Sequence, residues 1–70
     1  MAKAEIRNRV RELRQERGEM TQQELADRCD CTRQTIIMLE QGRYVPSLSL
    51  ALKIARTFEK NVEDVFVLEE

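Results

Sequence analysis

The sequence contains no histidine, and its 70 residues include only two cysteines, two glycines and one proline. Without histidine, the chain lacks the most frequent general base, proton shuttle and metal ligand of enzymes. Cys29 and Cys31 are too few for a structural zinc site, which needs four Cys or His ligands. Their spacing is also unfavourable for a disulfide between them. We therefore expect no metal, no cofactor and no catalytic site, and the composition favours a binding module over an enzyme.

Long apolar runs and an excess of one charge are absent as well. Twelve Lys and Arg against thirteen Asp and Glu give a net charge of −1, so the chain is not a polybasic coat for nucleic acid or membrane. No apolar run approaches the roughly 18 residues that span a bilayer, and the first residues lack the apolar core of a signal peptide. We expect a cytoplasmic protein without membrane contact, folded as a single domain over residues 1–70.

Hydrophobic residues recur at helical spacing through most of the chain. Ile6, Val10 and Leu13 lie at positions i, i+4 and i+7, which predicts an amphipathic helix over about residues 4–17. Further helices are expected over about residues 22–29, 33–41 and 48–58, with a short fifth one after residue 61. The side chains expected to cap them are Thr21 with Glu24, Thr32, Ser47, and Asn61 with Asp64. Those expected to be buried in the third and fourth helices are Ile36, Leu39, Leu48, Ala51, Leu52, Ala55 and Phe58.

Two short helices joined by a tight turn are typical of a helix-turn-helix. Asp30 tolerates a left-handed backbone better than most residues and is expected to end the first helix of the pair. The segment from Thr21 to Glu40 reads TQQELADRCDCTRQTIIMLE and is followed by a glycine and by a Pro-Ser cap. It closely resembles the helix-turn-helix of the lambda repressor, Cro and xenobiotic-response-element family.

The resemblance extends from about Ile6 to Phe66 and implies an all-α, five-helix, lambda-repressor-like domain whose motif covers about residues 21–41. Two acidic residues, Asp30 and Glu59, stand where the family usually has glycine. One extra residue, Glu19, lengthens the first turn. These departures affect stability and helix ends but remove no DNA contact.

The resemblance further implies that the second helix of the motif enters the major groove of DNA. Arg33 can donate two hydrogen bonds to O6 and N7 of guanine, and Gln34 can form two hydrogen bonds with N6 and N7 of adenine. The alternative is that both are merely exposed polar residues. Ile37 and Met38 either contact thymine methyl groups or belong to a wide core face. The implied base contacts are Arg33, Gln34, Thr35, Ile37 and Met38, and the implied phosphate contacts are Gln22, Thr32, Arg43 and Tyr44.

Two further pairs have structural interpretations. Arg14 and Glu40 match an ion pair between helices in the family, which implies a structural role for this arginine. Cys29 and Cys31 match apolar positions and are interpreted as small core residues. The alternative for Cys31, which precedes a helix, is a redox switch through a thiol of low pKa.

The tail of residues 66–70 is apolar, β-prone and acidic at its end. We expect it to pair as a short strand, with the same tail of a second subunit or with the chain's own N-terminal residues, across a two-fold axis. The alternative is a dimer formed by the fifth helix alone. The residues expected at the dimer interface are Val62, Val65, Phe66, Val67 and Leu68.

The sequence therefore predicts a sequence-specific regulator that binds double-stranded DNA. We expect a homodimeric repressor on a near-palindromic operator, without a small-molecule ligand. The alternative is an antitoxin or other protein-binding partner that uses the domain only for autoregulation.

Overall fold

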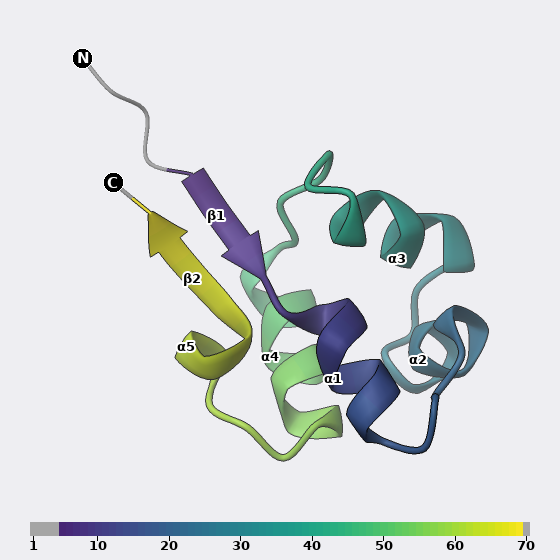
Figure 1. The fold of residues 1–70 in the computed structure, drawn as a ribbon. Helices are drawn as coiled ribbons and strands as arrows, with labels where there is room; N and C mark the ends of the chain where they lie inside the picture. Colours follow the sequence, from purple (N-terminus) through teal and green to yellow (C-terminus); the bar gives the residue numbers. More distant parts are fainter. Residues whose placement is uncertain (1–4, 70) are drawn as a thin grey trace.

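Five helices form a bundle, and a two-stranded sheet extends from one side of it (Figure 1). The computed structural model describes residues 5–69. In chain order the elements are β1 (Glu5–Asn8), α1 (Val10–Glu16), α2 (Gln22–Arg28), α3 (Arg33–Glu40), α4 (Leu48–Thr57), α5 (Val62–Val65) and β2 (Phe66–Glu69). The predicted five-helix fold is confirmed, while residue 4 of the first expected helix and residue 70 of the tail lie outside the described residues.

The prediction of helix for residues 5–8 is wrong, because these residues form β1. β1 pairs antiparallel with β2, so the C-terminal strand has its partner in its own chain. Ile6, at helical spacing from Val10, lies opposite Leu68 across the sheet instead of on a helix face. The paired residues are Glu5 and Glu69, Ile6 and Leu68, Arg7 and Val67, and Asn8 and Phe66.

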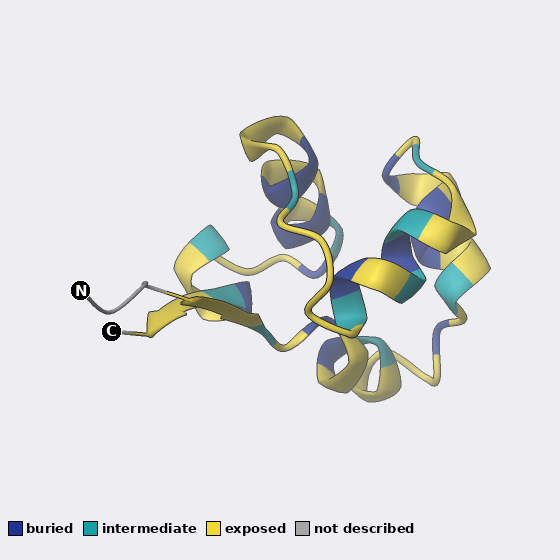
Figure 2. Cartoon of the chain, turned by 90° about the horizontal axis from the view of Figure 1, so that it is seen from above, coloured by how far each residue is buried: buried dark blue, intermediate teal, exposed yellow. Residues whose placement is uncertain are grey.

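The hydrophobic core lies between the helices, while most of the sheet is exposed (Figure 2). Its members are Val10, Leu13, Met20, Leu25, Ala26, Cys29, Ile36, Leu39, Leu50, Ile54, Ala55, Phe58 and Val65. The prediction that Leu48 and Leu52 point inward is wrong, since they are 72% and 51% exposed. In α4, Leu50 and Ile54 point inward instead. Leu48 and Leu52, each two positions earlier, lie at the surface.

Three helices end in the same way, through one residue with a left-handed backbone. Asp30, Gly42 and Glu59 have φ angles of 58°, 73° and 55°. The amide of the next residue then donates back into the last turn of α2, α3 and α4, to the carbonyls of Ala26, Met38 and Ala55 at 2.9–3.0 Å. The left-handed conformation predicted for Asp30 is therefore confirmed, and Glu59 shares it.

Candidate nucleic-acid interface

Hydrogen-bonded caps fix the starts of α2 and α3, the two helices of the motif. Thr21 Oγ1 accepts from the Glu24 amide, and the Glu24 carboxylate accepts from the Thr21 amide, both at 3.0 Å. The bond from the Thr21 backbone lowers the pKa of Glu24, because it stabilises the charged carboxylate. At the start of α3, Thr32 Oγ1 accepts from the Thr35 amide at 3.2 Å. The first turn of each helix is thus fixed by a side-chain cap.

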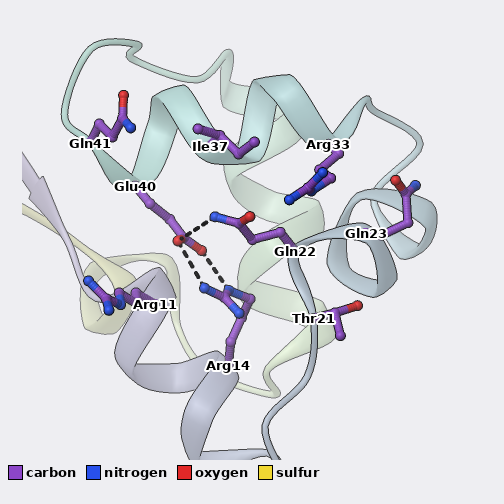
Figure 3. Close-up of a pocket in the computed structure, with 9 residues that line it drawn as sticks. All are labelled: Arg11, Arg14, Thr21, Gln22, Gln23, Arg33, Ile37, Glu40 and Gln41. Carbon is purple, nitrogen blue, oxygen red and sulfur yellow. Dashed lines mark hydrogen bonds and ion pairs between the residues drawn. The ribbon is translucent and has the colours of Figure 1, made fainter.

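A small polar network fixes the last turn of α3 against α1 and α2 (Figure 3). Arg14 of α1 donates to both carboxylate oxygens of Glu40, at 2.6 and 3.0 Å. Gln22 of α2 donates to the same carboxylate at 3.2 Å. The side chains of Arg14 and Glu40 are only 13% and 7% exposed, so water competes weakly for this ion pair. The network holds α3 in one orientation relative to the rest of the bundle.

A hollow of about 740 Å³ opens between α1, α2 and α3, and Figure 3 shows it with Arg33 and Ile37 extending from α3. Its charged lining comprises the guanidinium groups of Arg11, Arg14 and Arg33 and the carboxylate of Glu40. Three positive groups against one negative group leave two positive charges in excess. Such a surface favours an anion such as a phosphate of the DNA backbone.

The exposed surface of α3 carries most of the residues expected to contact bases. Arg33 and Gln34 are exposed in its first turn, and Met38 is 37% exposed one turn further along. Ile37 is half-buried and lines the hollow, and Thr35 is half-buried with its hydroxyl 2.9 Å from that of Thr32. Ile36 and Leu39 are buried, as the spacing predicted. The helix thus separates a core-facing stripe from an outer surface with hydrogen-bonding side chains.

The residues expected to contact phosphates lie at helix ends around this surface. Gln22 begins α2 and Thr32 immediately precedes α3, with their side chains already engaged in the network and the cap described above. Arg43 and Tyr44 are exposed in the loop after α3, whose path is fixed by the bond from the Arg43 amide to the Met38 carbonyl at 2.9 Å. Thr32 thus lies at the start of α3, whereas Arg43 and Tyr44 follow its end and Gln22 contacts its last residue, Glu40.

Sequence reasoning missed three residues that line the same hollow, namely Arg11, Gln23 and Gln41. Arg11 was not among the residues expected to contact DNA. Its spacing of three residues from Arg14 places the two on the same side of α1, and this was the signal that could have identified it.

The two cysteines do not have the low thiol pKa that a redox switch requires. Burial raises the pKa of Cys29. The contact of its sulfur with the Thr57 hydroxyl, 3.7 Å away, lowers this pKa but has the smaller effect. Burial also raises the pKa of Cys31. Both thiols therefore stay protonated at neutral pH, and they contribute to the core as small apolar residues, Cys29 as a member and Cys31 packed against it.

Comparison with known proteins agrees with this geometry. The sequence model described as helix-turn-helix matches residues 10–65 of the chain. A protein of Methanothermobacter thermautotrophicus, named an uncharacterized HTH-type transcriptional regulator, is 54% identical over 66 residues, which cover 93% of this chain and 94% of that protein. A protein of the same name from Archaeoglobus fulgidus is 49% identical over 65 residues, covering 93% and 91% of the two chains.

A bacterial protein is similar to the same degree. The uncharacterized HTH-type transcriptional regulator YgzD of Bacillus subtilis is 49% identical over 65 residues, covering 93% of this chain and 97% of YgzD. The matched region includes all five helices and the capped turn between α2 and α3. The chain belongs to the helix-turn-helix family of DNA-binding transcriptional regulators of the Cro and C1 type, a family of non-enzymatic proteins.

Proposed function

We propose that the protein is a repressor that binds a near-palindromic operator as a homodimer and blocks transcription by occupying it. α3 enters the major groove, with base contacts from its outer surface. The proposed base contacts are Arg33, Gln34, Thr35, Ile37 and Met38, and the proposed phosphate contacts are Gln22, Thr32, Arg43 and Tyr44. Because its target is DNA, we expect the protein to act in the cytoplasm, and among residues 5–69 no helix has the length and apolarity needed to cross a bilayer.

The observation that carries this proposal is the orientation of α3. Its first turn presents Arg33 and Gln34 to solvent, and its last turn is held through Glu40 by the ion pair with Arg14. Arginine and glutamine are the side chains that match guanine and adenine edges with two hydrogen bonds each. A helix that is fixed in place and exposes these two side chains is suited to reading a base sequence.

One face of the sheet supports the proposed dimer. Ile6 and Leu68 form a cross-strand pair on this face and are 42% and 59% exposed. Two apolar side chains gain free energy when a second copy covers them. Val67 points to the opposite face beside Arg7, and Val65 is fully buried in its own core, so Val65 offers no surface to a partner. The proposed interface is therefore centred on Ile6 and Leu68, flanked by the half-buried Val62 and Phe66.

Selection of bound sites from random duplex DNA tests the proposal. We expect a consensus of two inverted half-sites separated by about one helical turn, 34–36 Å from centre to centre. A consensus with a single half-site would contradict the dimer, and binding without any consensus would contradict a sequence-specific function. Co-purification of a second protein that abolishes DNA binding would favour an antitoxin instead.

A further inference from the structure

One asparagine connects the terminal sheet with the last turn of α3. Asn8 is the last residue of β1, and its Nδ2 group donates to the carbonyl oxygen of Leu39 at 2.9 Å. Its Oδ1 atom accepts from the amide of Val10 at 3.2 Å, which caps the start of α1. A single half-buried side chain thereby contacts β1, α1 and α3.

This contact is isolated. Across residues 5–69, the bond from Asn8 to Leu39 is the sole hydrogen bond or ion pair between a residue of the sheet and a residue of α3. Beside it, a hollow of about 550 Å³ separates β1 from the end of α3 and the loop that follows, with Ile6, Gln41 and Val45 in its lining. The Asn8 amide is therefore the direct polar connection between the sheet and α3 across residues 5–69.

Both ends of this connection are fixed. On the sheet side, Asn8 pairs with Phe66, and the next amide, that of Arg9, donates to the Val65 carbonyl at 2.9 Å. On the helix side, Leu39 is fully buried, and the adjacent Glu40 is held by Arg14. The side chain of Asn8 therefore joins two well-anchored parts of the molecule directly.

We propose that Asn8 is a positioning residue for operator recognition, which fixes α3 relative to the sheet and so sets the spacing between half-sites that the dimer accepts. This inference rests on the proposed function, in which the sheet lies at the two-fold axis and α3 reads DNA. One extra base pair moves a half-site around the DNA axis by about 35°. A dimer with rigidly placed helices rejects such a change, whereas a dimer with loosely placed helices tolerates it.

The chain offers closely matched variants. In Asn8→Ser, the hydroxyl still caps α1 but is too short to reach the Leu39 carbonyl. In Asn8→Asp, the acceptor for the Val10 amide remains and the donor to Leu39 is lost. The control is Arg7→Ala, which breaks the ion pair of Arg7 with Glu69 at 2.9 Å in the same strand but leaves the bond to α3 intact.

The experiment measures affinity for DNA that the wild-type protein has selected from random duplexes, and for the same DNA with half-site spacing changed by one base pair in either direction. A duplex with one half-site is measured in parallel. For Asn8→Ser and Asn8→Asp we expect the preference for the selected spacing to fall about threefold or more, with half-site affinity unchanged. Arg7→Ala should keep the wild-type preference.

Each other outcome overturns the inference. A folded Asn8→Ser protein with the wild-type spacing preference would show that Asn8 does not position α3. Equal loss of affinity at every spacing, or loss of helicity in both Asn8 variants, would show that it serves stability only. A wild-type protein that binds DNA regardless of spacing would contradict this inference alone, whereas one that binds no duplex would contradict the proposed function as well.

Discussion

At the scale of single residues, the surface proposed to face DNA and the contacts that hold α3 in place use different side chains. Arg33 and Gln34 are exposed, and Arg33 forms no ion pair among residues 5–69. The carboxylate of Glu40, on the same helix, accepts hydrogen bonds from Arg14 and Gln22. Substitutions in the two groups should therefore have separable consequences, one for recognition and the other for stability.

Substitutions on α3 and in the following loop test recognition. Arg33→Ala and Gln34→Ala should each weaken binding to the selected DNA by about 1–3 kcal/mol and relax the preference at one base position. Arg43→Ala should weaken binding to all duplexes alike and reduce the salt dependence of log K by about one unit. Affinity titrations over a range of salt concentrations distinguish these effects. An Arg33→Ala protein with unchanged consensus and affinity would show that α3 is not the reading helix.

Stability should depend on the ion pair of Arg14 with Glu40. Glu40→Ala leaves the guanidinium of Arg14, which is 13% exposed, without its carboxylate partner and with only its bond to the Met20 carbonyl at 2.8 Å. We expect the free energy of unfolding to fall by about 3 kcal/mol, the lower end of the range for broken buried pairs. Glu12→Ala, which removes the exposed ion pair with Arg9, is the control and should change little. Urea unfolding of the two variants measures the difference, and equal stabilities would contradict the structural role of Glu40.

At the scale of elements, backbone conformation at helix ends is strained where glycine is absent. Gly42 ends α3 at little cost, because glycine adopts positive φ freely. Asp30 and Glu59 adopt the same conformation with a side chain, which ordinarily costs about 1–2 kcal/mol per residue. Two of the three similar helix ends therefore store strain that a substitution can release.

Asp30→Gly is expected to stabilise the fold. Relief of the left-handed strain should exceed the entropy that the unfolded chain gains, for a net increase of about 0.5–1 kcal/mol. Asp30 is exposed, so little packing is lost. Asp30→Ala keeps a side chain at φ 58° and should be destabilising. Thermal melts of both variants give the result, and a lowered melting temperature for Asp30→Gly would mean that the carboxylate stabilises the turn more than its backbone strains it.

The elements also show what could be derived from the sequence. Caps at Thr21, Thr32 and Ser47 were predictable because they are local hydrogen bonds, and the structure contains all three. Pairing of the tail with the chain's own N-terminal residues was one of two predicted alternatives and is confirmed, but β1 was not located, because Ile6 has helical spacing from Val10 while its actual partner, Leu68, is distant in sequence. Strand pairing over this distance leaves no local pattern. The hydrogen bond from Asn8 to Leu39 was not predictable for the same reason, because it depends on where the sheet lies.

At the scale of the whole molecule, the bundle and the sheet have different degrees of burial. The core contains no residue of β1 or β2, although Phe66 packs against it. In Figure 2 the sheet extends from the bundle with most of its residues exposed. The helices can therefore remain folded when the sheet face is altered, which allows assembly and folding to be tested separately.

A matched pair of substitutions in β2 tests whether the face with Ile6 and Leu68 is the dimer interface. Leu68→Glu places a charge on this face, whereas Val67→Glu places the same charge on the opposite face, beside Arg7. If the face is covered in the dimer, each of two copies loses about 1.5–3 kcal/mol of apolar burial in Leu68→Glu, which weakens the dimer at least about a hundredfold. Sedimentation should then show monomers for Leu68→Glu and dimers for Val67→Glu, with unchanged helicity by circular dichroism in both. Operator affinity should fall only in the variant that loses the dimer, since two linked half-sites bind more tightly than one. A dimeric Leu68→Glu protein would move the interface to α5, around the half-buried Val62.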